Sequence, residues 1–325
     1  MISRYRLVVN GSGHAFLREF GCSCARCRER KHTANTSVSI VGGDPRSGRL
    51  TWHALVDVGL GVNTSLCNYF NPDEARVDQL LLSHWHPDHT LEINRLGETA
   101  RRTAFRRGEK FTKIPTWCRN GTARWLQKNH SYEWYRHLLP HNTNEASHPG
   151  SILDPVPLET TGLKITPVAV SHVTADIDPA NFKDRLYCSA FFVVEAAGKK
   201  AVLLWDADGS NDWILAPDTP EQEDAVALIS EADYLFIDCF NWNTEEVRGF
   251  NTGHLSFSTV RKYAAAISPR QTLLVHISGH EDGKGNPGWG WTDEQWTVEA
   301  QKAWDASKLP GSVRVPSIGE EFPLF

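Results

Sequence analysis

The sequence Leu80-Leu81-Leu82-Ser83-His84-Trp85-His86-Pro87-Asp88-His89 is the most informative stretch of the chain. Its three consecutive leucines predict a buried strand, and the polar residues that follow predict a loop at the end of that strand. Side chains two positions apart in an extended chain point the same way, which brings His84 and His86 together. Three imidazoles and one carboxylate within six residues form a ligand set for Zn²⁺ or a similar ion. A metal site is therefore predicted here, and a solvated histidine-rich turn is the alternative.

Short apolar segments rich in β-branched residues recur along the chain and are bounded by Gly, Pro, Asp or Asn, as strands are. The predicted strands are Arg6–Val9, Ser37–Val41, Trp52–Val58, Gln79–Leu82, Leu163–Val170, Ser189–Val194, Ala201–Trp205, Tyr234–Ile237 and Thr272–Ile277. Helical periodicity predicts helices over Glu92–Phe105, Thr122–Asn129, Glu221–Ser230, Ser256–Ile267 and Thr292–Lys308. Ser256 and Thr292 are the expected N-caps of the last two. Strands alternate with helices, which predicts a layered α/β sandwich.

Two stretches are expected to be insertions or loops. The first, Arg119–Thr160, is polar and rich in histidine, and the second, Asp282–Trp291, contains four glycines. A third insertion is expected over Asp176–Tyr187. No linker rich in Pro and Ser divides the chain, so residues 1–325 are expected to form a single domain.

Composition limits the classes of protein that the chain can represent. Its 325 residues are 40% hydrophobic and 22% charged, as in a globular protein. The net charge of −5 gives no general surface for a polyanion, so nucleic acid is not expected as a partner. No apolar run approaches the roughly 20 residues that span a bilayer, so no membrane association is expected. The apolar stretch within the first ten residues is too short for a leader and is expected to be a strand.

Three of the seven cysteines lie within six residues, in Gly21-Cys22-Ser23-Cys24-Ala25-Arg26-Cys27. The spacing Cys-x-Cys-x-x-Cys suits a metal ion better than a set of disulfides, and it indicates a reducing, cytoplasmic compartment. A structural zinc needs four ligands, so a fourth must come from elsewhere in the chain. Three reduced core cysteines are the alternative, although the residues between them are not apolar.

The segment from His84 to His89 matches the His-x-His-x-Asp-His signature of the metallo-β-lactamase superfamily, which the chain resembles. Leu55-Val56-Asp57-Val58-Gly59 resembles the strand and the Asp-x-Gly turn ahead of that signature. Further matches follow predicted strands in the order of the family, at His172, Asp206 and His276. The resemblance covers essentially the whole chain and implies an α/β fold, the four-layer αββα metallo-β-lactamase sandwich.

The resemblance also implies a centre of two divalent ions, Zn²⁺ or Mn²⁺, about 4 Å apart. The implied ligands are His84, His86 and His172 for one ion, Asp88, His89 and His276 for the second, and Asp206 as the bridge. Asp88 thereby takes part in catalysis. Asp208 is the alternative bridging group, and Asp57 is expected to hydrogen-bond to a ligand instead of binding an ion.

Within the superfamily, Asn10-Gly11-Ser12-Gly13 followed by the three cysteines resembles the PhnP-type phosphoribosyl cyclic phosphodiesterases. That resemblance implies one structural zinc held by Cys22, Cys24, Cys27 and a histidine shortly after His276, which here is His280. The family spacing is one residue shorter, which makes Gly279 an insertion. The resemblance further implies that His254 is a general acid, a role worth on the order of 10²–10⁴-fold in rate.

The resulting prediction is a dinuclear metal-dependent hydrolase, favoured as a phosphodiesterase. A metal-bound hydroxide would attack a small cyclic or nucleotide-like phosphodiester, and His254 would protonate the leaving oxygen. One alternative is an iron-dependent oxidoreductase of PQQ-biosynthesis B type; the intact motif at His84–His89 argues against it, because that protein departs from the hydrolase motif. A lactone or thioester hydrolase, a metal-bearing scaffold and an RNA-processing nuclease are further alternatives. The expected partner is a small-molecule substrate, and a homodimer is left open.

Overall fold

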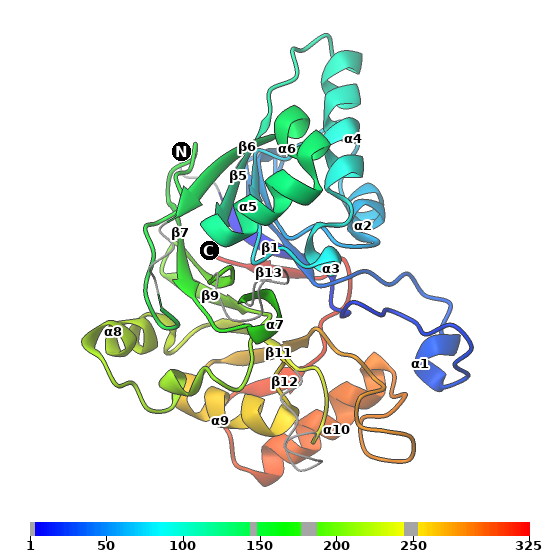
Figure 1. Ribbon diagram of the computed structural model, residues 1–325, viewed down its shortest axis with the longest axis vertical. Coiled ribbons are helices and arrows are strands. Elements are labelled where there is room, and N and C mark those ends of the chain that lie inside the picture. Colours follow the sequence, from blue (N-terminus) through cyan, green and yellow to red (C-terminus); the bar gives the residue numbers. More distant parts are fainter. Residues whose placement is uncertain (1–3, 144–147, 177–186, 244–252) are drawn as a thin grey trace.

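The computed structural model describes residues 4–143, 148–176, 187–243 and 253–325, and in it two β-sheets lie face to face (Figure 1). The first sheet has the strand order β13-β1-β2-β3-β4-β5-β6. Its strands are β1 (Arg4–Gly11), β2 (Ser37–Gly43), β3 (Leu50–Val56), β4 (Gln79–Leu81), β5 (Ile114–Arg119), β6 (Leu138–Thr143) and β13 (Glu321–Pro323). From β3 to β6 the neighbouring strands are parallel, so their carboxyl ends lie at one edge.

The second sheet has the order β12-β11-β10-β9-β8-β7 and is parallel from β12 to β9. Its strands are β7 (Leu163–Ala169), β8 (Ala190–Ala196), β9 (Lys199–Leu204), β10 (Tyr234–Asp238), β11 (Gln271–Val275) and β12 (Ser312–Arg314). The helices are α1 (Ala25–Arg28), α2 (Val62–Tyr69), α3 (Pro87–Thr90), α4 (Ile93–Arg106), α5 (Asn120–Asn129), α6 (Ser131–His137), α7 (Val173–Asp176), the 3₁₀ turn η1 (Asp212–Ile214), α8 (Pro220–Ile229), α9 (Phe257–Ile267) and α10 (Asp293–Ala306).

Strand β4 shows how the layers arise from the sequence. Successive side chains of a strand point to opposite faces, and both faces of this strand are apolar. Leu81 packs into the core between the two sheets, together with Phe192 and Phe236 of the second sheet. Leu80 and Leu82 point the other way, into a core beneath the helices on the outer face of the first sheet. A strand covered on both sides is therefore leucine throughout, without polar alternation.

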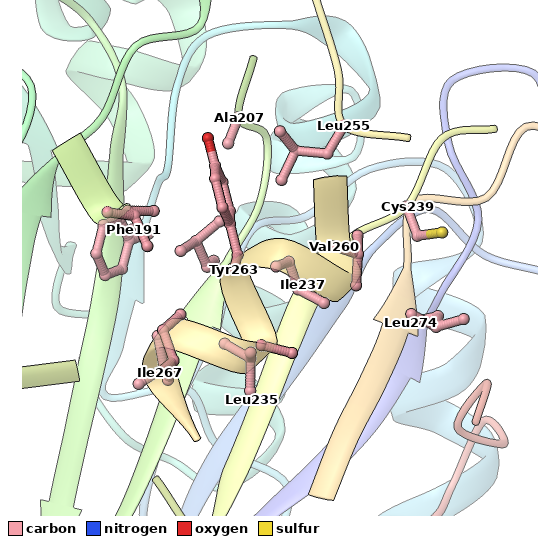
Figure 2. Close-up of a cluster of buried hydrophobic side chains, with 14 of the residues drawn as sticks. Phe191, Ala207, Leu235, Ile237, Cys239, Leu255, Val260, Tyr263, Ile267 and Leu274 are labelled. Carbon is pink, nitrogen blue, oxygen red and sulfur yellow. The ribbon is translucent and has the colours of Figure 1, made fainter. Parts of the chain in front are cut away.

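The outer face of the second sheet is covered in the same manner by α8, α9 and α10. Figure 2 shows Val260, Tyr263 and Ile267 of α9 over Leu235 and Ile237 of β10. Helices α2, α4, α5 and α6 lie on the opposite side of the molecule (Figure 1). Two sheets between two layers of helices make the four-layer αββα sandwich, which confirms the expected fold.

All nine predicted strands and all five predicted helices are present, with ends that differ by a few residues. Ser256 and Thr292 are N-caps, since their hydroxyls accept hydrogen bonds from the backbone N–H groups of Thr259 and Gln295. Thr292 and Gln295 form a capping box, which explains why α10 begins where it does.

Within Arg119–Thr160, which was expected to be an insertion or loop, the predicted helix Thr122–Asn129 is present as α5. The expectation of a loop is wrong for residues 131–143, which form α6 and β6, and β6 is the edge strand of the first sheet. Strands β5 and β6 escape a sequence-based prediction because each contains a proline, Pro115 or Pro140, which argues against a strand. Asp282–Trp291 contains neither helix nor strand, as expected of a loop. Of the insertion expected over Asp176–Tyr187, residues 177–186 lie outside the described part of the chain.

Within the described parts of the chain, no helix is long and apolar enough to cross a membrane.

Candidate active site

The site lies where strands of the two sheets end. His84 and His86 follow β4 of the first sheet, while Asp206 follows β9 and His276 follows β11 of the second. Strands β4 and β11 run parallel to both neighbours, and β9 runs parallel to β10, so the residues after these strands emerge at shared edges of the sheets. Ligand sites of α/β folds commonly lie at such edges, because the strands hold the side chains in place while the loops can differ from protein to protein.

The carboxylate of Asp206 is at the centre. Its Oδ2 lies 3.2 Å from Nε2 of both His89 and His276. The same oxygen lies 3.7 Å from Nε2 of His84 and 3.8 Å from Nε2 of His172. One oxygen atom therefore faces four imidazoles, which come from both sheets.

Asp206 belongs to three donor sets, in each of which the ligand atoms lie within 4.8 Å of one another, and one of them joins Asp206 to Asp238, His254 and His276. The two sets that contain the expected ligands are His84, His86, His172 and Asp206, and Asp88, His89, Asp206 and His276. Nε2 of His84, Nε2 of His89 and Oδ1 of Asp206 are buried and have no hydrogen-bond partner among the described residues. Buried polar atoms are normally paired, so unpaired nitrogens around a carboxylate fit divalent cations in both sets.

The alternative bridge, Asp208, points elsewhere. Its Oδ2 accepts hydrogen bonds from Ser171 Oγ at 3.1 Å and from the backbone N–H of Val173 at 2.7 Å. Its Oδ1 accepts a hydrogen bond from the backbone N–H of Ser210. Asp208 thus anchors the chain on both sides of His172, and among these two carboxylates the geometry favours Asp206 as the bridge.

Asp57 supports the site from behind, as expected of a residue that hydrogen-bonds to a ligand. Its Oδ2 accepts hydrogen bonds from His89 Nδ1 at 2.8 Å, Trp205 Nε1 at 2.8 Å and Ser83 Oγ at 2.7 Å. The hydrogen bond from Nδ1 of His89 to Asp57 orients the ring so that Nε2 is directed at Asp206. His172 is oriented similarly, because its Nδ1 lies 2.8 Å from the carbonyl oxygen of Gly253.

Burial and charge act on these groups in opposite directions. Burial, with help from His89 and His86, holds the pKa of His84 well below its usual range, and burial does the same for His172. Burial would also lower the pKa of His89, but Asp206, Asp88 and Asp57 raise it well above the usual value. The carboxylates around His89 thus stabilise a positive charge there, as a cation site requires.

Asp238, at the end of β10, is a site residue that the sequence analysis did not identify. Its Oδ2 lies 2.8 Å from Nδ1 of His254, and its Oδ1 lies 3.9 Å from Nδ1 of His276. Burial would lower the pKa of His254, but Asp238 raises it to about 9. The available signal is the position: β10 lies between β9 and β11, whose ends carry Asp206 and His276.

The cysteine cluster, defined here as Cys22, Cys24, Cys27 and His280, is a separate donor set. Nε2 of His280 lies 3.4, 3.3 and 3.5 Å from the Sγ atoms of the three cysteines in chain order. The structure therefore brings together the four residues that were expected to hold a zinc. On the far side of the ring, Nδ1 of His280 lies 3.1 Å from Oε1 of Glu19. A carboxylate behind a histidine ligand is a common support of zinc sites.

Known structures share this architecture. The metallo-β-lactamase fold protein YhfI of Bacillus subtilis is 16% identical with a TM-score of 0.63, and the match covers 98% of this chain and 99% of that one. A diphosphatase of the PhnP family is 18% identical with a TM-score of 0.63, covering 99% of this chain and 98% of that one. Zinc-bound PqqB of Methylobacterium extorquens is 17% identical with a TM-score of 0.64, covering 98% and 99%. At these identities the likeness shows the fold alone.

A search of curated proteins found no match. The family model described as the beta-lactamase superfamily domain matches residues 54–277, which is more than half of the 325 residues and includes the whole histidine and aspartate centre. On this match, and with the four-layer fold around that centre, the chain belongs to the beta-lactamase superfamily of metal-dependent, hydrolase-like folds.

Proposed function

We propose that the protein is a dinuclear metal-dependent phosphodiesterase that acts on a small, cyclic or nucleotide-like phosphodiester. The observation that carries the proposal is the position of Asp206 Oδ2. Asp206 is shared by the two donor sets that contain the expected ligands. Its Oδ2 also lies 3.9 Å from Nδ1 of His254, the histidine that is paired with Asp238. Two cation sites beside a proton donor suit hydrolysis of a phosphodiester.

The residues divide the work between holding cations and moving a proton. His84, His86 and His172 would hold one cation, Asp88, His89 and His276 the second, and Asp206 both. When bound, two such cations supply a water-derived nucleophile at neutral pH and neutralise charge on the attacked group. Asp57 keeps Nε2 of His89 directed at the cation site, because it accepts the hydrogen bond that Nδ1 donates.

His254 fits the role of general acid. Nδ1 of His254 donates to Asp238, so Nε2 is the nitrogen that can deliver a proton to a leaving oxygen. With a pKa of about 9 the ring is protonated at neutral pH, and two bound cations would bring this value down toward neutrality. Asp238 stabilises the protonated ring and fixes its orientation.

We further propose that the cysteine cluster holds a structural zinc. The three sulfurs and one imidazole are a closed set of four, which is the composition of structural zinc sites. Every cysteine of the chain is a free thiol in the structure. A reducing, cytoplasmic location goes with this proposal, because thiolates must stay reduced to bind zinc.

The test is metal analysis combined with hydrolysis of bis-p-nitrophenyl phosphate, on the wild type and on Asp206→Ala. We expect the wild type to cleave the diester, and Asp206→Ala to lose this activity and the active-site ions while keeping the cysteine-bound ion. The control is Asp224→Ala, which removes an exposed carboxylate of α8.

The same assays separate the alternatives. Turnover of a lactone or a thioester without turnover of the diester would move the protein to another class of hydrolase. Iron as the native metal, with no hydrolysis of any activated ester, would overturn the proposal in favour of redox chemistry.

A further inference from the structure

His276 has an unusual backbone conformation. Its φ of 61° lies in the left-handed region, where residues other than glycine are rare and persist only if the surroundings hold them. One side of this support is Ser12, whose carbonyl oxygen accepts hydrogen bonds from the backbone N–H groups of His276 at 2.8 Å and Ile277 at 3.4 Å. The position of the His276 imidazole therefore depends on what holds Ile277 and its neighbours.

The other side of the support comes from the cysteine cluster. Arg26 lies on α1 between Cys24 and Cys27, and its Nη2 donates to the carbonyl oxygen of Ile277 at 3.4 Å. Its Nη1 donates to the carbonyl oxygen of Trp291 at 3.3 Å. The guanidinium thus ties the segment after His276 to the loop that precedes α10.

Arg26 is itself held firmly. Its Nη1 lies 2.9 Å from Oδ1 of Asp293, the first residue of α10, and its side chain is only 11% exposed. Oδ2 of Asp293 lies 3.0 Å from Nζ of Lys31, so two cations of this N-terminal segment share one carboxylate. A planar guanidinium with several fixed donors suits such a junction better than an ammonium group.

Two glycines make room for this arrangement. A Cβ on Gly279, whose φ is 82°, would lie 2.5 Å from Cδ of Arg26. A Cβ on Gly290 would lie 2.7 Å from Cβ of Cys24. The spacing from His276 to His280 is one residue longer than in the resembled group, and Gly279 is the extra residue. In the structure the side chain of Arg26 lies against Gly279.

We propose that Arg26 is a positioning residue that couples the cysteine cluster to His276, and so strengthens binding of the ion held by Asp88, His89 and His276. The inference rests on the proposed metal centre. Its consequence is an asymmetry between the two active-site ions, because Arg26 touches the chain next to His276 and not the chain next to His84, His86 or His172.

The test compares Arg26→Met with Arg28→Met, an exposed arginine of the same helix. Each purified holoprotein is titrated with a chelator, and bound metal is counted at each step. We expect Arg26→Met to release one active-site ion at a chelator concentration lower by about 10–100-fold, the usual effect of losing a group that supports a ligand. Its remaining ions should dissociate as in the wild type, and Arg28→Met should match the wild type throughout.

Cobalt substitution shows which ion is lost. Absorption from cobalt–thiolate bonds reports the cysteine cluster alone, so it should persist in Arg26→Met while one active-site ion dissociates. Arg26→Lys keeps a cation near Asp293 but lacks the forked donors, and we expect its chelator sensitivity to lie between those of wild type and Arg26→Met. If Arg26→Met does not fold, Arg26→Lys carries the test.

Two results would overturn the inference. One is release of all ions from Arg26→Met at wild-type chelator concentrations, and the other is loss of the thiolate absorption before any active-site ion. A wild type that binds no pair of ions at the histidine and aspartate centre would instead refute the proposed function, so the two failures are distinguishable.

Discussion

The histidine and aspartate centre takes its side chains from strand ends of both sheets, whereas the cysteine cluster takes three of its four from one short segment. His84, His89 and His172 are fully buried, and the sheets hold them in place. Cys22 and Cys27 are only partly buried, and α1, which contains Cys27, is a four-residue helix without a buried residue. We therefore expect the core to build the first site before any ion binds, and the second site to need its proposed ion to hold the segment together.

The largest expected effect is the loss of the ion from the cysteine cluster. In Cys24→Ser the closed set of four is broken, and structural zinc contributes apparent free energies of about 10–16 kcal/mol in small zinc peptides. We expect loss of that ion and rapid hydrogen exchange in residues 14–33 and 279–291, while β1 to β4 stay protected. Hydrogen exchange with mass spectrometry measures this, and Cys67→Ser, an exposed thiol, is the control. Unchanged protection in the first segment would show that the segment does not depend on the ion.

The next effect tests the proton donor of the other site. We expect His254→Gln to lower kcat by about 10²–10⁴-fold with unchanged metal content, because the ring is assigned to proton transfer and not to a cation. Steady-state kinetics and metal analysis check this, with the exposed His148→Gln as control. Loss of an ion in His254→Gln would assign the ring to the donor set of Asp206, Asp238 and His276 instead.

A smaller effect should follow from removing the carboxylate behind His89. Asp57→Asn keeps the shape of the side chain but loses the charge that accepts hydrogen bonds from His89, Trp205 and Ser83. We expect metal affinity to fall by about 10–100-fold. A chelator titration measures it, with the exposed Asp73→Asn as control. Wild-type affinity in Asp57→Asn would mean that the sheets alone orient His89.

The smallest effect concerns His53, a histidine outside both sites. Its variant distinguishes unfolding at low pH from the loss of metal ions at low pH. Burial lowers the pKa of His53 to about 4. In the unfolded chain His53 takes up a proton near pH 6.5, whereas in the folded chain it stays neutral until about pH 4. The free energy of unfolding therefore falls as the pH falls from about 6.5 to 4. At pH 5.5 the loss is about 1 kcal/mol relative to neutral pH.

We expect His53→Gln to lack this part of the pH dependence, although its stability at neutral pH is also lower because Ser39 and Arg76 lose their partner. Denaturant unfolding of metal-free protein at pH 7.0 and 5.5 measures the difference. An equal pH dependence in the wild type and His53→Gln would contradict the assignment.

Several structural features could be predicted because their causes are local. The strand of Leu80–Leu82 follows from a short apolar run, and the start of α10 follows from the spacing of Thr292 and Gln295. The family motif at His84–His89 then implies the remaining ligands. These inferences depend on neighbours in sequence, which a single chain displays directly.

Other features depend on partners that are distant in sequence. Strand β6, with its proline, is a strand because β5 is beside it. Asp238 is recognised as a site residue through its contacts with His254 and His276. Arg26 is distinguished from Arg28 by its contacts with Ile277, Trp291 and Asp293.

The sequence alone was enough to predict which residue types would bind cations and roughly where strands would present them. The folded arrangement was needed to show what Asp208 contacts, to find Asp238 and to place Arg26 beside Ile277. The reason is physical. Ligand chemistry and strand propensity belong to short segments of chain, whereas the direction of a carboxylate and the partner of a guanidinium are set by groups that only packing brings within 3–4 Å.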